Sequence, residues 1–286
     1  MKMIKNEILN RIQLVVMDLD NTLLDDNNKI GDETKHLVKE LSVLGVQFSI
    51  ASRLSFSAVA EYADELQIKI PLITFDGALI QRYPGEKSIF KSELSEKTVL
   101  RALNLADRYL LKSALFHDSA IYLTEENGVA PLLLEKFGVK LEQIESYEHF
   151  LKGTLEVLIV GEYQNSVKHV AHQMSFPYTF GVRSSFYKSQ SQDGTYYLEI
   201  KKMGSNKGDG LRRLTKHLKI KMEKTAVIGD WYNDKPLFDT DALKIAVANA
   251  IPELKKMADI VTKRSNNEDG VAEFLKMLLQ SKNNMM

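Results

Sequence analysis

The sequence predicts an α/β protein built around a parallel sheet and interrupted by an α+β insertion. Three observations lead to this fold class. In the first third of the chain, short apolar segments alternate with amphipathic ones, which is typical of strands joined by right-handed helical crossovers. The last third repeats this alternation. The middle contains segments in which polar and apolar residues alternate and aromatic residues are frequent, as in antiparallel strands.

The first third contains three predicted strands and two helices. The apolar run at residues 14–17 is the first strand, and a helix follows with Asp32 as its expected cap and leucines at i, i+4 and i+7. Residues 46–51 are the second strand and residues 71–75 the third, with a helix between them. We expect all of these strands to belong to one parallel sheet.

The other two thirds differ from each other in their elements. The last third contains a helix near residue 211 and the strands "TAVIGD", "KIAVAN" and "DIVT", each followed by a helix, the last of which begins near Asp269. The middle contains helices over 95–110, near 131–137 and from 165, the hairpin "SALFHDSAIYL", and the strands "LEVLIVGEY", "YTFGVRSSFYK" and "TYYLEIKK". The predicted domains are a core of residues 1–83 and 191–286 and an insertion of residues 84–190.

Composition limits the kinds of partner. Lys and Arg number 38 and so do Asp and Glu, so no overall field attracts nucleic acid or an anionic membrane. There is no cysteine, which excludes disulfides, a thiol nucleophile and a cysteine-ligated metal. No segment has the length and apolar character of a membrane span or a signal peptide. We therefore expect a cytoplasmic protein without a nucleic-acid or membrane partner; the sequence does not predict its oligomeric state.

Polar residues gather where predicted strands end. They are Asp18, Asp20 and Thr22 after the first strand, Ser52 after the second, and Asp230, Asn233 and Asp234 in the segment "GDWYND". Ligands of open parallel sheets bind beyond the carboxyl ends of the strands. If these strands are neighbours, the four aspartates crowd one edge of the sheet.

Such crowding predicts a magnesium site. Carboxylates a few ångströms apart repel one another and take up protons unless a cation neutralises them. Mg²⁺ prefers oxygen ligands, and no cysteine or histidine adjoins the acids, which argues against zinc. The candidate metal ligands are therefore Asp18, Asp20, Asp230 and Asp234. Lys207, at the start of a predicted helix, could hold a phosphate oxygen, and the Ser52 hydroxyl could donate to another, which together indicate phosphoryl transfer.

Asp18 and Asp20 can then have separate roles. A carboxylate is ionised at neutral pH and can attack phosphorus without a general base, forming an acyl phosphate. A neighbouring carboxyl with a raised pKa can protonate the leaving oxygen and later deprotonate the attacking water. The pair therefore fits a nucleophile and an acid/base, and Thr22 would fix the loop or contact phosphate.

At this point the motifs resemble a known family. "DLDNTLL", "IAS", the lysine of "KGDGL" and "GDWYND" are similar to the four motifs of the haloacid dehalogenase (HAD) superfamily of phosphohydrolases. "ITFDGALI" and "AVANAIPELKKMADIVTKRSNNEDGVAEFL" resemble its Cof-type subfamily. The resemblance implies a Rossmann-like core with an inserted cap that closes over the substrate. It also implies that Asp18 is the nucleophile and Asp20 the acid/base, whose backbone carbonyl binds Mg²⁺.

The resemblance carries over to the remaining site residues. Ser52 and Lys207 match the phosphate-binding hydroxyl and lysine, and Asp230 matches a metal ligand. Asn233 and Asp234 match residues that contact phosphate and support the metal.

Three positions depart from the family pattern. Ala51-Ser52-Arg53 stands where Thr-Gly-Arg is common, Asp76 stands where asparagine is usual, and Trp231 is bulky for a loop beside the site. We expect Arg53, Asp76 and Trp231 to flank the phosphate site and to narrow the range of accepted leaving groups.

The predicted function is thus an Mg²⁺-dependent phosphatase of a small phosphorylated metabolite, such as a sugar phosphate, a nucleotide or a cofactor phosphate. Two alternatives use the same phosphorylated aspartate. A phosphotransferase or phosphomutase would return the phosphoryl group to a sugar hydroxyl, and a non-catalytic receiver-like signalling module would keep it. The length of the chain, its insertion and the position of Asp20 count against the signalling module.

Overall fold

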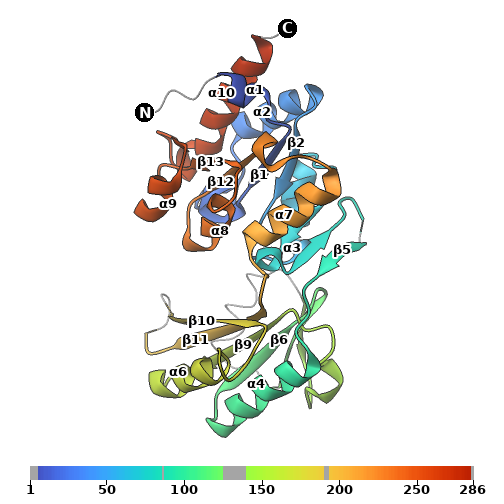
Figure 1. Ribbon diagram of the computed structural model, residues 1–286, viewed down its shortest axis with the longest axis vertical. Helices are drawn as coiled ribbons and strands as arrows, with labels where there is room; N and C mark the ends of the chain where they lie inside the picture. Colours follow the sequence, from blue (N-terminus) through green and yellow to red (C-terminus); the bar gives the residue numbers. More distant parts are fainter. Residues whose placement is uncertain (1–5, 86, 125–139, 190–192, 285–286) are drawn as a thin grey trace. The chain divides into compact units, whose positions relative to one another are not determined.

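The chain folds into two compact units. The computed structural model describes residues 6–85, 87–124, 140–189 and 193–284 (Figure 1). Residues up to Ile89 and from Asn206 onward form one unit, which we call the core unit. Phe90–Ser205 form the other, which we call the inserted unit.

A five-stranded parallel sheet forms the centre of the core unit. Its strands lie in the order β14 (Ile260–Val261), β13 (Leu243–Ala246), β12 (Thr225–Gly229), β1 (Leu14–Met17) and β2 (Gln47–Ile50). Met17 lies opposite Ile228 of β12 on one side and Ile50 of β2 on the other. Every residue of β1 and β12 is buried, as expected for strands covered on both faces. The strands that end just before Asp18 and Asp230 are therefore neighbours, which meets the condition under which the aspartates would crowd one edge of the sheet.

The helices of the core unit pack in two groups. One group is α1 (Asn6–Asn10), α2 (Asp32–Val43) and α10 (Gly270–Asn283); the other is α7 (Lys207–Leu218), α8 (Lys235–Phe238) and α9 (Pro252–Met257). A further helix, α3 (Phe56–Glu65), packs on β2 and β3. In α2 the predicted apolar face is buried through Leu37 and Leu41. None of the helices in the described part of the chain has both the length and the apolar character that a membrane crossing needs, and a cytoplasmic location stays a prediction.

The start of α2 differs from the prediction. Asp32 is its first helical residue and does not cap it, because the capping position is taken by Gly31. A carboxylate from the start of α10 serves the helix end instead: Asp269 Oδ2 accepts the backbone N–H of Thr34 at 3.0 Å. This contact joins segments that are far apart in the sequence, so helix-capping rules applied along the chain do not find it.

The third predicted strand also differs. β3 (Leu72–Thr74) is joined to the edge of the parallel sheet by an isolated bridge between Ala51 and Ile73. Its regular pairing is antiparallel, with β4 (Leu79–Gln81), and β5 (Ser88–Lys91) completes this small sheet. The chain reverses after β3 at residues 75–77, where successive residues have positive φ. That tight reversal, a single turn of 3₁₀ helix, brings β4 back beside β3.

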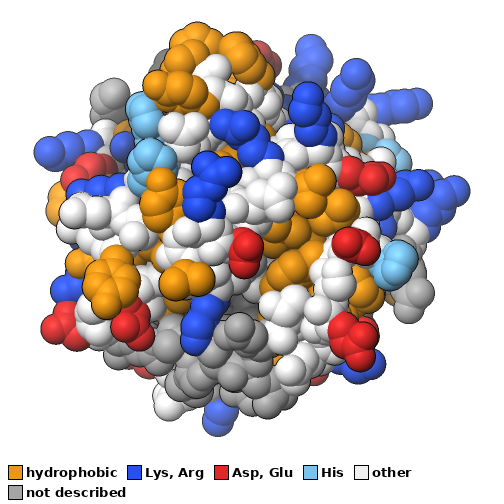
Figure 2. Space-filling model, turned by 90° about the horizontal axis from the view of Figure 1, so that it is seen from below, with side chains coloured by type: hydrophobic (Ala, Val, Ile, Leu, Met, Phe, Trp, Pro, Cys, Tyr) orange, Lys and Arg blue, Asp and Glu red, His pale blue; other side chains and the backbone are white. Residues whose placement is uncertain are grey.

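The inserted unit is an α+β structure, as predicted. Its sheet has the order β10 (Val182–Lys188), β11 (Tyr196–Lys202), β9 (Glu156–Gly161), β6 (Lys112–Phe116), β7 (Ala120–Leu123) and β8 (Lys140–Gln143). All neighbours are antiparallel except β7 and β8. The helices α4 (Glu96–Arg108) and α6 (Gln164–Gln173) cover one face of the sheet (Figure 1). Figure 2 shows basic, acidic and apolar side chains intermixed on one face of the molecule, in keeping with the balanced composition.

The unit boundaries correct the predicted domains. The expected boundaries at 83/84 and 190/191 fall too early in the chain, because the units change at Ile89 and Asn206. β11 was assigned to the core, but it pairs with β9 and β10 and so belongs to the inserted unit. The helix predicted near 131–137 lies outside the described residues.

Candidate active site

The turn after β1 separates the two aspartates of the first motif. Asp18 follows the last residue of β1, and its backbone N–H donates to the carbonyl of Ile228 at 2.9 Å, which extends the parallel pairing with β12 by one residue. Its side chain is buried, whereas Asp20 is exposed. Asn21 has a φ of 56°, so the chain bends sharply directly after Asp20. The two carboxylates therefore have different environments, as a nucleophile and an acid/base would require.

Asp234 organises the loop after β12. Its Oδ2 accepts the backbone N–H groups of Asp230 at 3.0 Å and Trp231 at 3.2 Å. The side chain is fully buried. Gly229 allows this arrangement, because a Cβ at that position would lie 2.6 Å from Asp234 Oδ2. The loop thus holds the Asp230 and Asp234 carboxylates beside the end of β1.

Lys207 lies between two of these carboxylates. It is the first residue of α7, whose start is capped by Asn206: the Asn206 Oδ1 accepts the backbone N–H of Asp209 at 2.9 Å. The Lys207 ammonium is fully buried, donates to Asp234 Oδ1 at 2.7 Å and also contacts Asp18 Oδ1. Burial lowers the pKa of Lys207, but Asp18 and Asp234 outweigh it and the pKa is raised. Lys207 is therefore a permanent cation inside the cluster.

The cluster has the donor set of a hard metal ion. Within the described residues, ligand oxygens of Asp18, Asp230 and Asp234 lie within 4.8 Å of one another. The Asp20 side chain is not part of this group. Three carboxylates without cysteine or histidine fit Mg²⁺ and not zinc.

The protein alone does not neutralise this cluster. Burial, followed by the nearby Asp234 charge, raises the pKa of Asp230 to about 6. Burial and the charge of Asp234 also raise the pKa of Asp18 well above its ordinary value, although Lys207 opposes them. One lysine faces three carboxylates, so a divalent cation would complete the charge balance.

Thr22 has a different contact from the predicted phosphate contact. Its hydroxyl donates to Asp230 Oδ1 at 2.9 Å, and the residue is buried. The bond joins the turn after β1 to the loop after β12. The geometry agrees with the loop-fixing role that was predicted as the other possibility for Thr22.

Ser52 and Asn233 are connected through Asp76. Ser52 lies just past β2, is fully buried, and its Oγ accepts the backbone N–H of Leu54 at 3.0 Å. Its carbonyl accepts the backbone N–H of Asp76 at 3.0 Å, and Asn233 Nδ2 donates to Asp76 Oδ1 at 3.3 Å. Trp231 is 47% exposed and Arg53 is half-buried. Asp76 is thus hydrogen-bonded to predicted site residues through both its backbone and its side chain.

Two residues that act on predicted site residues were not themselves predicted. The charge of Asp20 acts on Tyr62 of α3: burial, and then this charge, raise the pKa of Tyr62. Asn206 caps the helix that begins with Lys207. Asn206 could have been found, because an asparagine directly before an amphipathic helix is a capping signal. Tyr62 carries no such signal, since its approach to Asp20 depends on how α3 packs.

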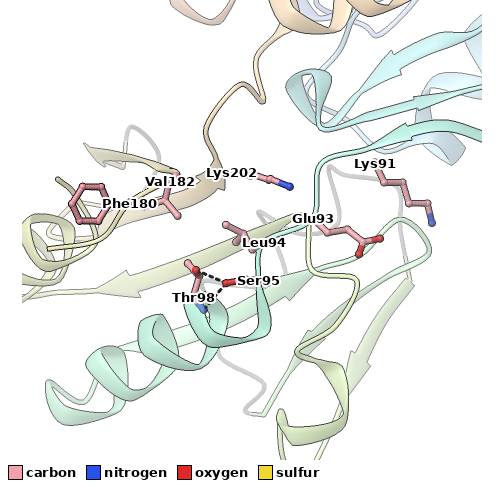
Figure 3. A pocket seen from close by; sticks show the side chains of 9 residues that line it. Lys91, Glu93, Leu94, Ser95, Thr98, Phe180, Val182 and Lys202 are labelled. Atoms are coloured by element: carbon pink, nitrogen blue, oxygen red, sulfur yellow. Dashed lines mark hydrogen bonds between the residues drawn. The ribbon is translucent and has the colours of Figure 1, made fainter. Parts of the chain in front are cut away.

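A separate concave feature lies in the inserted unit. It is a cavity of about 610 Å³ beside the start of α4, where Ser95 and Thr98 are hydrogen-bonded (Figure 3). Lys202 and Phe180 also line it, and Lys91 at its margin is paired with Asp118. None of the predicted site residues lines this cavity; all of them lie in the core unit.

Fold and site together define the class of protein. The sequence pattern of the haloacid dehalogenase-like hydrolases matches residues 15–275, and the chain belongs to this family. Among its relatives, phosphatase YwpJ of Bacillus subtilis (strain 168) is 27% identical over 294 residues, which cover 94% of this chain and 100% of that protein. The 5-amino-6-(5-phospho-D-ribitylamino)uracil phosphatase YitU of the same organism is 24% identical over 269 residues, with coverage of 92% and 96%.

Solved structures agree with this assignment. TM0651 from Thermotoga maritima superposes with a TM-score of 0.80 at 25% identity, covering 93% of this chain and 97% of that one. A haloacid dehalogenase-like hydrolase from Bacteroides thetaiotaomicron has a TM-score of 0.78 at 21% identity, with coverage of 93% and 98%. The predicted fold class and family are therefore confirmed, and the relatives support a phosphatase enzyme.

Proposed function

We propose that the chain is an Mg²⁺-dependent phosphatase that hydrolyses a small phosphorylated metabolite through an aspartyl-phosphate. One observation carries the proposal: the buried carboxylates of Asp18, Asp230 and Asp234 meet around Lys207 at the carboxyl ends of neighbouring parallel strands. A lysine and a bound cation at this position would together attract a phosphate dianion and neutralise its charge.

Two displacements at phosphorus make up the reaction. In the first, a carboxylate oxygen of Asp18 forms a bond to phosphorus while the bond to the leaving oxygen breaks, and Asp20 donates its proton to that oxygen. In the second, Asp20 takes a proton from water as the water oxygen bonds to phosphorus. Inorganic phosphate then leaves and the Asp18 carboxylate is restored. The exposure of Asp20 suits this role, since it must exchange protons with substrate and water.

Lys207 and the metal ligands prepare Asp18 for the attack. Lys207 holds Asp18 Oδ1 and opposes the rise in the pKa of Asp18 that burial and the Asp234 charge cause. Asp18, Asp230 and Asp234, together with the backbone carbonyl of Asp20, would hold Mg²⁺. When bound, Mg²⁺ supplies positive charge that lowers the repulsion between the carboxylates and the phosphate.

The inserted unit would act as the cap that selects the leaving group. Relatives support a small phosphorylated substrate: the name of YitU specifies a phosphorylated ribitylaminouracil. We therefore propose a screen of sugar phosphates, nucleotides and cofactor phosphates for phosphate release in the presence of Mg²⁺.

The test uses a general phosphate ester first. Wild-type protein should release phosphate from p-nitrophenyl phosphate with Mg²⁺, EDTA should stop the reaction, and added Mg²⁺ should restore it. Asp18→Asn should abolish turnover, whereas Asp241→Asn, which changes an exposed acid of the same unit, should have no effect. Beryllium fluoride should form an adduct at Asp18. Turnover by Asp18→Asn, or an adduct on another residue, would exclude the proposed nucleophile, and isomerised hexose phosphate without phosphate release would favour a phosphomutase.

A further inference from the structure

The loop after β3 has an unusual backbone. Phe75, Asp76 and Gly77 have φ values of 48°, 50° and 87°. Residues other than glycine, asparagine and aspartate rarely adopt this left-handed conformation, and a buried phenylalanine in it is unusual. Surrounding contacts must therefore impose the conformation, and such strain collects at functional sites.

The loop is held against two segments that carry predicted phosphate-binding residues. The backbone N–H of Asp76 donates to the carbonyl of Ser52 at 3.0 Å, and that of Phe75 to the carbonyl of Leu54 at 3.1 Å. On its other side, a Cβ on Gly77 would lie 2.2 Å from the backbone oxygen of Asn206, directly before Lys207. The loop therefore fits closely between the end of β2 and the start of α7.

The Asp76 side chain reaches a third segment. Its Oδ1 accepts Nδ2 of Asn233 at 3.3 Å, next to the metal-site residue Asp234. A carboxylate only accepts hydrogen bonds, so the contact determines which end of the Asn233 amide faces Asp76. The second hydrogen on Nδ2 and the amide oxygen of Asn233 then have defined directions.

We propose that Asp76 is a positioning residue, whose acceptor oxygen orients the Asn233 amide for its contact with the substrate phosphate. Position 76 then has two requirements: a residue that tolerates positive φ and a side-chain acceptor of this length. Glycine meets only the first, whereas aspartate and asparagine meet both. The proposal rests on the proposed phosphatase function, because Asn233 acts through the phosphate.

Three variants separate the hydrogen bond from the backbone conformation. Asp76→Gly keeps the left-handed backbone and removes the acceptor, and we expect kcat/KM to fall about tenfold, mainly through KM. Asp76→Asn keeps an acceptor oxygen and should stay within about threefold of wild type. Asn233→Ala should lower kcat/KM as much as Asp76→Gly does. The double variant Asp76→Gly/Asn233→Ala should have the same kcat/KM as Asn233→Ala alone, because both substitutions remove the same interaction.

The Tm of each variant, and an NMR signal that does not depend on turnover, complete the experiment. The Asn233 side-chain amide, assigned by its loss in Asn233→Ala, should give distinct signals in wild type and Asp76→Asn and should shift to averaged positions in Asp76→Gly. The proposal is overturned if Asp76→Gly retains wild-type kcat/KM, or if Asp76→Asn loses as much kcat/KM as Asp76→Gly. It is also overturned if the double variant shows the product of the two single losses in kcat/KM, or if the amide signals of Asn233 do not change in Asp76→Gly. A wild-type protein without phosphatase activity would instead overturn the proposed function, and the amide signals would still test the contact.

Discussion

The hydroxyl of Thr22 donates to Oδ1 of Asp230 over 2.9 Å, and both residues are buried. The bond connects the turn after β1 with the loop after β12. Because this hydrogen bond favours the charged form of Asp230, it opposes the rise in the pKa of Asp230 that burial causes. It also limits the rotation of a carboxylate that would have to face a metal ion. A residue that the motif places near phosphate is therefore bonded to a candidate metal ligand.

Removing this hydroxyl should weaken Mg²⁺ binding. Thr22→Val keeps the shape of the side chain but leaves the Asp230 oxygen without its donor, so the carboxylate is harder to ionise and less well oriented. We expect the Mg²⁺ dissociation constant to rise about tenfold, measured by the Mg²⁺ dependence of Tm. Thr22→Ser should restore binding. Equal Mg²⁺ affinity in Thr22→Val and wild type would show that the bond does not support the metal site.

Loss of the buried lysine should destabilise the protein most at high pH. Lys207→Met leaves Asp18 and Asp234 without their cation, and removing one partner of a buried ion pair costs about 3–5 kcal/mol. Asp18, whose pKa burial already raises, can escape part of this cost by binding a proton, so the loss should be smaller at pH 5 than at pH 8. Urea unfolding in EDTA at both pH values measures it. Lys216→Met removes an exposed charge from the same helix and should change stability little; an equal loss at both pH values in Lys207→Met would contradict the charge argument.

The metal-free protein should show the raised pKa of Asp230 as a pH dependence of stability. The folded pKa of about 6 lies above the ordinary value of 3.8, so the folded state binds the proton more tightly than the unfolded state. The resulting stability is fully present below pH 3.8 and is lost as the pH rises through about 6. Asp230→Asn has no group that titrates at this position. Between pH 3.8 and about 6 the wild type should therefore lose stability relative to the variant, by at most about 3 kcal/mol.

Added Mg²⁺ should reverse this trend, because the ion binds the deprotonated carboxylates. The measurement is the free energy of unfolding of both proteins between pH 4 and 8, in EDTA and in Mg²⁺. A constant difference between wild type and Asp230→Asn in EDTA would mean that Asp230 has an ordinary pKa.

Gly77 should tolerate no side chain, for reasons of space as well as conformation. In Gly77→Ala the new Cβ would lie 2.2 Å from the backbone oxygen of Asn206, which would force the loop away from α7. We expect a loss of about 2–4 kcal/mol from the combined clash and strain, and reduced phosphatase activity as Lys207 moves. Gly45→Ala is the matched control, because Gly45 has a φ of 84° but nothing within 4 Å of the added Cβ. It should lose only about 1 kcal/mol and keep full activity. If both variants lose the same stability, the clash with Asn206 contributes nothing to the effect of Gly77→Ala.

Much of the core and part of the site could be predicted from local patterns. Apolar runs that end in aspartate identified β1 and β12, and their parallel pairing explains why Asp18 and Asp230 meet. The place of Lys207 followed from its motif. Strand ends carry this information because parallel strands bring their carboxyl ends to one edge whatever lies between them in the sequence.

Errors arose where a distant segment competed with a local signal. Asp32 has the right chain position to cap α2, but Asp269 supplies the contact from another helix. The strand at residues 196–202 lies close in sequence to the core, yet it pairs within the inserted unit. Local propensity is worth a few tenths to about 1 kcal/mol, so tertiary contacts readily override it.

The sequence by itself determined the class of fold, the family and the set of candidate site residues, because these depend on periodicity and on short motifs at strand ends. Only the tertiary structure decided how these residues contact one another: that Lys207 bridges Asp18 and Asp234, that Thr22 holds Asp230, and that Asp76 faces Asn233. Each of these contacts joins segments that are far apart in the sequence, and their hydrogen bonds form only when packing of the parallel sheet has brought the segments within about 3 Å of each other.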